Sequence, residues 1–520
     1  MSTSRRLHVL ALLALAAASC AEAPPQPVPV RPPAVPVAAK VPAAPLPEPA
    51  LASAPRVTPD APFRATIPAA APEAPFAVPP FRRFKLKNGL EVILAEFHDL
   101  PLVELNLVFK AGGAANPTDL AGLADLTRRM LDEGTKTRTA PQIADELATL
   151  GANLGGAGGW DSSSLGLSVL SKNLDAGLAL FADVATAPAF DAKEFERVRA
   201  NNLTAIARRK DSPPTVANLA FARLLYGGKH PFGWPVTGVE ASLKKVTPAD
   251  LRAFYDKRFR PNDAVLIVAG DTNEATLRPK LEAAFKSWKS RPVPASKVPA
   301  PAPAAEKTRI FLIDKADAPQ SSIRVGTVGL DRKSPDYFPA IIMNMILGGG
   351  FYRLDMNLRE GKAWTYGARS SLEARKTPGP FSAGGEFVAP HTAESVQEIL
   401  KEISAMRDAD VTDAELARAK DQIIKSFPAR FGTRAALSSQ LAEVAVYGLP
   451  NDYLATYVKK VAAVTKEDVR RVARKLLDPS RLTIVVVGDQ KTLEAPLSKV
   501  APVELRDLEG NPVPSPPAKD

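Results

Sequence analysis

The sequence has 520 residues, of which 45% are hydrophobic and 24% are charged, so it can form two sizeable hydrophobic cores. Its formal net charge of +11 is spread along the chain without a concentrated basic run, which argues against nucleic-acid binding and indicates a general surface charge that favours acidic peptides. The single cysteine, Cys20, excludes a disulfide within the chain.

Residues 1–20 have the pattern of a secretory signal. Two arginines precede an apolar run of about a dozen residues, which is too short for a stable membrane-spanning helix. Cys20 follows Ala-Ala-Ser, which resembles a lipoprotein box, so lipidation is favoured over a small buried residue or a reactive thiol. Ala21 and Glu22 are similar to the residues after the cysteine in outer-membrane lipoproteins. We therefore expect a lipid-anchored protein of the bacterial cell envelope, held at the outer membrane and facing the periplasm.

Residues 21–80 are dominated by Pro, Ala and Val and have no periodic pattern. Such a composition favours extended chain without a packed core. We predict a disordered tether that joins the membrane to a folded body.

The first folded element is predicted within Phe84–Phe97. Asn88-Gly89 separates two runs of alternating polarity there, and this dipeptide is the strongest short-range signal for a β-hairpin. The sequence therefore predicts two antiparallel strands with a tight turn.

A helix is predicted from Gly122 to Thr135, with apolar residues at helical spacing on one side. These are Leu123, Leu126 and Met130. The opposite side carries Asp125, Arg128 and Arg129. Taken alone, these three residues are typical of a solvated helix face with an ion pair between Asp125 and Arg129.

A glycine-rich stretch, Leu150–Leu170, leads into a predicted strand. Its glycines do not match a nucleotide-binding loop, because no Gly-Lys-Ser or Gly-Lys-Thr follows them. We therefore expect a glycine-rich approach to a strand here and not a phosphate-binding loop.

An internal repeat indicates a duplicated domain. Residues 246–271 recur as residues 464–489, at a constant offset of 218 residues. Each copy predicts a helix, a Pro turn and a buried strand that ends in Gly-Asp, with Thr247 and Thr465 as helix caps.

A segment rich in Pro and Ala separates the two copies and marks the boundary between domains. The predicted divisions are residues 81–292 for the N-terminal domain, 293–307 for the linker, 308–495 for the C-terminal domain and 496–520 for a tail.

In the second copy, Gly348–Ser370 carries Arg359 and Tyr366, seven residues apart. A guanidinium group can hold a carbonyl or carboxylate with two hydrogen bonds, and a Tyr hydroxyl can donate to the oxyanion of a tetrahedral intermediate. The alternative is structural, with Arg359 capping a helix end and Tyr366 packed on a strand.

The segment Gly122–Thr135 resembles the zinc-binding helix of the pitrilysin and insulinase family of metallopeptidases, through Gly122, Leu123, Ala124, Met130, Leu131, Gly134 and Thr135. In that family the helix carries His-x-x-Glu-His. Here Asp125, Arg128 and Arg129 stand at the His, Glu and His positions, and the third ligand, a Glu, falls at Ala205. The resemblance therefore implies a degenerate metal site and no metal in this chain.

Gly348–Ser370 resembles the family's C-terminal signature, in which an Arg and a Tyr reach the substrate; Arg359 and Tyr366 match them. A lost metal site beside a kept Arg and Tyr is similar to the non-catalytic subunits of bacterial heterodimeric peptidases with half-size chains. The resemblance implies an α+β fold of two duplicated domains, each a mainly antiparallel sheet packed with helices. It also implies a partner chain that carries His-x-x-Glu-His and zinc, and a peptide substrate bound as an added strand.

Two other functions stay open. One is an envelope scaffold or binding protein with no proteolytic role. The other is an independent enzyme that uses new chemistry at Asp125, although no nucleophile or base accompanies it. No independent peptidase activity is expected. Three histidines, His98, His230 and His391, are isolated in sequence and predict packing or surface roles.

Overall fold

The computed structural model describes residues 65–66, 76–301 and 306–513. Residues 75–520 form one unit. The predictions for Cys20, for the signal and for nearly all of the tether lie outside the described residues. Within the part of the chain that is described, no helix is long and apolar enough to cross a membrane.

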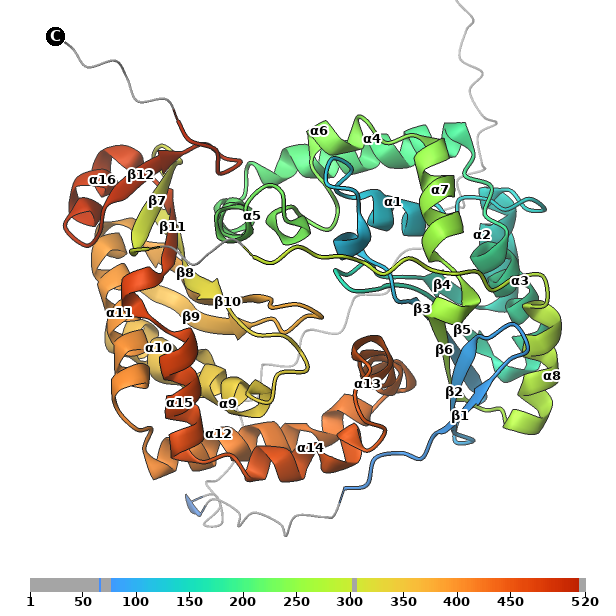
Figure 1. Ribbon diagram of the computed structural model, residues 1–520. Helices are drawn as coiled ribbons and strands as arrows, with labels where there is room; N and C mark the ends of the chain where they lie inside the picture. Colours follow the sequence, from blue (N-terminus) through green and yellow to red (C-terminus); the bar gives the residue numbers. More distant parts are fainter. Residues whose placement is uncertain (1–64, 67–75, 302–305, 514–520) are drawn as a thin grey trace, which may run out of the picture. The chain divides into compact units, whose positions relative to one another are not determined.

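The N-terminal half of the described chain contains a six-stranded sheet with the order β1-β2-β6-β3-β5-β4 (Figure 1). Its strands are β1 (Arg82–Lys85), β2 (Glu91–Glu96), β3 (Leu102–Phe109), β4 (Asn153–Gly155), β5 (Ser163–Leu170) and β6 (Ala264–Gly270). All neighbours are antiparallel except β2 and β6. The predicted hairpin is confirmed as β1 and β2, with Gly89 in the turn at a φ of 86°.

The C-terminal half contains a second six-stranded sheet, again within the described residues, with the order β12-β7-β11-β8-β10-β9. Its strands are β7 (Arg309–Asp314), β8 (Gln320–Val328), β9 (Thr365–Leu372), β10 (Pro380–Val388), β11 (Thr483–Gly488) and β12 (Val503–Arg506). Strand β7 is parallel to β11 and β12, and the other pairs are antiparallel.

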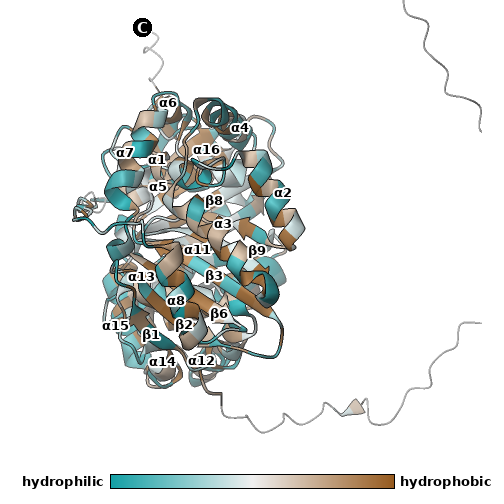
Figure 2. Ribbon diagram, turned by 90° about the vertical axis from the view of Figure 1, so that its right-hand side faces the viewer, coloured by the Kyte–Doolittle hydropathy of each residue, from teal (hydrophilic) through white to brown (hydrophobic). Residues whose placement is uncertain are grey.

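Helices cover both sheets. In the N-terminal half they are α1 (Leu123–Arg129), α2 (Ala140–Leu150), α3 (Leu174–Thr186), α4 (Ala192–Arg209), α5 (Pro213–Tyr226), α6 (Glu240–Leu243), α7 (Pro248–Arg258) and α8 (Glu274–Ala284). In the C-terminal half they are α9 (Tyr337–Gly348), α10 (Arg353–Asp355), α11 (Thr392–Asp408), α12 (Asp413–Ser426), α13 (Arg434–Tyr447), α14 (Tyr453–Ala462), α15 (Lys466–Leu476) and α16 (Gln490–Ser498). Hydrophilic and hydrophobic residues alternate along the outer helices, as amphipathic packing requires (Figure 2).

The sequence repeat corresponds to a repeat in structure. Thr247 and Thr465 cap α7 and α15, and each accepts a hydrogen bond from the backbone of an Asp three residues later. Both helices lead into the third strand of their sheet, β6 and β11, which are buried along their whole lengths. The predicted fold class, two α+β domains with mainly antiparallel sheets, is confirmed.

Two helices are exchanged between the halves. Helix α5 packs against β8 and β11 of the second sheet, and α13 packs against β3 and β6 of the first (Figure 1). Phe221 of α5 is buried with Val485 and Val487, and Ser438 of α13 accepts a hydrogen bond at 3.1 Å from the amide of Asn106. Each half therefore supplies part of the core of the other.

Candidate functional site

Helix α1 carries Asp125, Arg128 and Arg129, the residues predicted to stand at a degenerate metal site. It is shorter than predicted, because it ends at Arg129 and Met130 is its C-cap. Asp125 is 4% exposed, and its carboxylate accepts a hydrogen bond from Nε of Arg129 at 2.7 Å. A guanidinium nitrogen of Arg128 lies 3.8 Å from the same carboxylate. The predicted ion pair of Asp125 with Arg129 is confirmed.

The prediction of a solvated helix face is wrong for Asp125 and Arg128. The glycine-rich segment after β4 covers them: a Cβ added at Gly158 would lie 2.5 Å from Oδ1 of Asp125, and one at Gly156 would lie 3.2 Å from Cδ of Arg128. The Arg128 side chain is consequently 11% exposed, and its Nε has no hydrogen-bond partner among the described residues. Only glycine lets the backbone approach the helix this closely.

The position of the third ligand lies on α4. Ala205 is exposed and carries no donor atom. One turn later, Arg209 donates to Oγ1 of Thr237 at 2.5 Å, and its charge acts on Asp125 and Arg129. Sequence analysis missed Arg209, although its helical spacing from Ala205 was a usable signal.

The residues around Asp125 do not fit a zinc ion. Zinc takes imidazole, thiolate or carboxylate ligands, whereas a guanidinium group stays protonated and cannot coordinate a metal. Asp125 is engaged by Arg129, and the described residues contain no group of three potential ligands. A zinc site holds one metal cation with several ligands. Here a single carboxylate, Asp125, instead holds arginine cations.

Arg359 and Tyr366 lie in the other half, at the edge of the second sheet. Arg359 belongs to a π-helical turn, Met356–Gly361, and Tyr366 belongs to the edge strand β9. Tyr366 is 91% exposed, so the alternative in which it packs on a strand is wrong. The Arg359 guanidinium lies 5.3 Å from the ring centre of Phe351, which is itself about half exposed. An aromatic hydroxyl and a guanidinium group are thus available to a ligand.

A buried carboxylate, Asp355, organises this region. It is fully buried and accepts hydrogen bonds from the backbone amides of Phe351 at 3.1 Å and Ala368 at 3.4 Å. Guanidinium nitrogens of Arg369 and Arg359 lie 3.2 and 3.6 Å from it. Although burial acts to raise the pKa of Asp355, the Phe351 amide and Arg369 outweigh it and hold the pKa below its usual value. Sequence analysis did not identify Asp355, because its partners come from separate elements.

A cavity of about 510 Å³ lies beside this region, between α5 and strands β9 and β10. Its floor is made of small residues of the strands, including Gly367, Ser371 and Ser382. Its walls carry the rings of Trp160 and Trp234 and the side chains of Arg324, Arg369, Arg375, Glu373 and Glu386.

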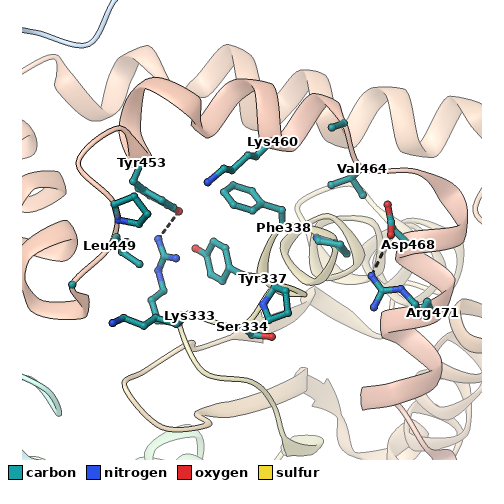
Figure 3. Close-up of a pocket in the computed structure, with 16 residues that line it drawn as sticks. Lys333, Ser334, Tyr337, Phe338, Leu449, Tyr453, Lys460, Val464, Asp468 and Arg471 are labelled. Carbon is teal, nitrogen blue, oxygen red and sulfur yellow. Dashed lines mark hydrogen bonds and ion pairs between the residues drawn. The ribbon is translucent and has the colours of Figure 1, made fainter.

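A larger cavity, of about 680 Å³, lies among α9, α14, α15 and the segment that follows α13 (Figure 3). The rings of Tyr337, Phe338 and Tyr453 converge in it, and the Lys460 amine points toward Phe338. Arg332 is buried between these rings and is held by Glu443 at 2.7 Å. None of the residues predicted for substrate or metal lines this cavity. Its size alone therefore does not make it the candidate site.

The histidines take separate structural roles. Nδ1 of His98 lies 2.9 Å from Asp271, His230 accepts a hydrogen bond from the Phe232 amide, and His391 stacks on Trp364. Burial lowers the pKa of His230, which favours the neutral ring.

Comparison with known proteins identifies relatives over most of the described chain. The model of the insulinase family (peptidase family M16) matches residues 91–228, and the model of the peptidase M16 inactive domain matches residues 245–423. An uncharacterized zinc protease of Rickettsia felis is 26% identical over 349 residues, which are 66% of this chain and 82% of that protein.

Solved structures share the fold. The peptidase M16 inactive domain from Pseudomonas fluorescens is 27% identical, with a TM-score of 0.73 over 79% of this chain and 98% of that one. A protease from Helicobacter pylori is 21% identical, with a TM-score of 0.73 over 79% of this chain and 100% of that one.

The two matched family models together cover more than half of the chain, and the second of them begins in the N-terminal half, before α7 and β6, and continues into the C-terminal half. Sequence similarity and fold agree. This chain belongs to the insulinase family of peptidases, family M16.

Proposed function

We propose that this chain is a zinc-free, non-catalytic subunit of a peptidase of the M16 family, and that it binds the peptide substrate with Arg359 and Tyr366. Zinc would come from a separate family member that carries His-x-x-Glu-His. The observation that carries the proposal is the contrast between the two regions. Arginines and one buried carboxylate stand where the family binds its metal, whereas Arg359 and Tyr366 are presented to a ligand.

The chemistry of the second region suits a role in binding. The Tyr366 hydroxyl is free to donate to a peptide carbonyl or to an oxyanion, and Arg359 can hold a carbonyl or a carboxylate. The buried Asp355 carboxylate lies 3.6 Å from the Arg359 guanidinium and helps to orient it. These residues would bind and orient a peptide, and the proton transfers of hydrolysis would belong to the partner chain.

The proposed location is the bacterial envelope. A signal at residues 1–20, a lipid on Cys20 and a tether over residues 21–80 would hold the folded body beside the outer membrane, on its periplasmic side. A partner chain and peptides would reach it there.

The test begins with purification of the tagged chain from its own cell envelope, followed by identification of the chains that accompany it. We expect a His-x-x-Glu-His partner and peptide cleavage that a chelator abolishes. Metal analysis of the isolated chain should give no stoichiometric zinc.

Variants then test the residues. Arg359→Ala and Tyr366→Phe should leave assembly intact and lower peptide turnover by about 100-fold, the usual cost of losing an oxyanion donor. Unchanged turnover in both variants would refute the substrate-binding role. Recovery of unrelated envelope proteins without cleavage would instead support a scaffold, and one zinc per isolated chain would overturn the degenerate site.

A further inference from the structure

The degenerate metal site has an excess of positive charge. The guanidinium groups of Arg128, Arg129 and Arg209 act on Asp125. One other carboxylate that acts on them is Asp132, whose pKa is raised by burial. Burial also lowers the pKa of Arg128 and of Arg209, because their charges are only partly compensated. An anion placed beside this group would recover part of the lost solvation.

The cavity beside β9 contains one guanidinium nitrogen that is left without an acceptor among the described residues. Its walls carry Arg324, Arg369 and Arg375, and each pairs with one carboxylate, namely Glu386, Asp355 and Glu373. The Arg375 guanidinium lies 4.7 Å from the ring centre of Trp160, and its Nη1 is buried without a hydrogen-bond partner in the described chain. A buried guanidinium nitrogen without an acceptor favours a ligand that brings a carboxylate.

Short segments of the chain connect the degenerate metal site with the cavity beside β9. Gly158 lies against Asp125, and Trp160, two residues later, lines the cavity. On the other side, Arg209 bonds to Thr237, and Trp234 and Pro235 line the cavity just before it. A peptide that extends from the cavity toward α1 would therefore meet arginine side chains along its path.

We propose that the peptides bound by this chain are acidic, with carboxylate side chains placed against the arginines of the degenerate metal site and of the cavity beside β9. This inference rests on the proposed function, because it names the substrate class of the same site. The substitutions at the zinc-ligand positions would then have a second effect besides the loss of the metal. An anion at the old metal position would meet the Arg129 side chain, which is 41% exposed, whereas Arg128 lies under the glycine-rich segment.

The physical reason is electrostatic complementarity in a partly desolvated site. Opposite charges separated by about 4 Å attract several times more strongly where water is excluded than they do in bulk solvent. A basic peptide would meet repulsion at both places, and a neutral one would leave the buried guanidinium nitrogens without an acceptor. Charge on the peptide should therefore decide affinity more than the size of its apolar side chains.

The experiment measures the binding of labelled peptides to the full mature chain in detergent by fluorescence anisotropy. The peptides share one length and one sequence, except that three positions carry Glu, Gln or Lys. We expect the Glu peptide to bind about tenfold more tightly than the Gln peptide, and the Lys peptide to bind most weakly. Added salt should weaken the binding of the Glu peptide more than that of the other two peptides.

Substitutions of the two partners of one ion pair should change the affinity for the Glu peptide in opposite directions. Arg129→Gln removes a positive charge and should weaken the Glu peptide about fivefold. Asp125→Asn removes the opposing negative charge and should strengthen it about threefold. If the ion pair had only a structural role, both variants would change the affinity in the same direction, because each variant breaks the same pair. Thermal unfolding of both variants checks that they are folded.

Matched controls come from α8. Glu274 and Arg278 form an ion pair at 3.1 Å with the same spacing of four residues, and the exposure of Arg278 is close to that of Arg129. Arg278→Gln and Glu274→Gln should leave the affinity for the Glu peptide within twofold.

The outcomes separate the two proposals. Binding of the Gln or Lys peptide as tightly as the Glu peptide would overturn the acidic-substrate inference and leave the binding role standing. A shift of the same sign in Arg129→Gln and Asp125→Asn would also overturn it. Absence of binding for all three peptides, in the chain alone and with its partner, would refute the proposed function itself.

Discussion

Individual carboxylates decide where the arginines of this chain point. Asp125 and Asp355 are both buried, and each holds more than one guanidinium group. A buried charge is costly unless it is paired and hydrogen-bonded, and the arginines and backbone amides meet that requirement. The Arg359 guanidinium lies 3.6 Å from Asp355 and 3.5 Å from Glu360, and 5.3 Å from the ring centre of Phe351.

The first prediction concerns the pH dependence of stability in Asp355→Asn. The folded-state pKa of Asp355 is below its unfolded value, so its ionised form stabilises the fold above about pH 4, and this stabilisation is lost as pH falls through the folded pKa. At pH 7 the variant should lose about 1–3 kcal/mol of unfolding free energy, because charge-assisted hydrogen bonds are weakened. Urea titrations between pH 7 and pH 3.5 measure the difference, which should shrink below about pH 4.

Asp119→Asn is the control, because Asp119 is an exposed carboxylate in the loop before α1. It should stay within about 0.5 kcal/mol of the natural chain. A destabilisation of Asp355→Asn that grew toward acid pH would contradict the assignment.

At the scale of elements, a loop rather than a helix closes the degenerate metal site. Helix α1 has only seven residues, and its polar face would be open to solvent if the glycine-rich segment did not lie on it. Strand β4 is correspondingly short, with three residues, whereas its counterpart β9 has eight. The two sheet edges have thus diverged: one ends in a cover for α1, and the other carries Tyr366.

The second prediction tests this contact. Gly158→Ala would place a Cβ 2.5 Å from Oδ1 of Asp125, so the loop or the ion pair must move, at a cost of about 1–3 kcal/mol. Gly155→Ala meets nothing within 4 Å and should stay within about 0.5 kcal/mol. Chemical denaturation of both variants measures the contrast. Equal stabilities would mean that the loop does not lie on Asp125.

At the scale of the whole folded unit, the exchanged helices make the two halves depend on each other. Arg324 donates to the side chain of Asn218 on α5 at 2.6 Å, and the Tyr226 hydroxyl donates to the carbonyl of Pro378 at 3.1 Å. Apolar residues of α5 and of α13 fill the cores next to these bonds. The fixed relation of the halves keeps the cavity beside β9 in contact with the loop that covers α1.

The third prediction is that cutting the chain between the halves does not separate them. A protease site inserted near residue 298, in the exposed segment before residue 301, should give two fragments that migrate together on native size exclusion. They should part only in denaturant, because each fragment holds a helix inside the core of the other. Separation under native conditions would show that the exchange contributes little.

Local signals in the sequence were sufficient for several elements of the fold. The Asn88-Gly89 turn, the caps at Thr247 and Thr465 and the buried strands β6 and β11 depend on residues close in sequence, and each was confirmed. The substrate role of Arg359 and Tyr366 stays a prediction, as do the domain boundaries and the lipid on Cys20.

The sequence by itself determined that a domain is duplicated, because a repeat at a constant offset of 218 residues is visible without the fold. The resemblance to the family supplied the α+β architecture and the prediction that Asp125, Arg128 and Arg129 stand at its metal positions. Only the tertiary structure decided that Asp125 is buried, that Arg209 joins its arginines, that Asp355 holds Arg359 and that α5 and α13 exchange places. The burial of Asp125, the approach of Arg209 and the exchange of α5 and α13 depend on residues that are distant in the chain. Asp355 and Arg359 are four residues apart, and there the fold decides only the burial of the carboxylate. Burial, and with it the strength of a charge, is set by what folds over a residue, and the spacing of its neighbours in sequence does not record that.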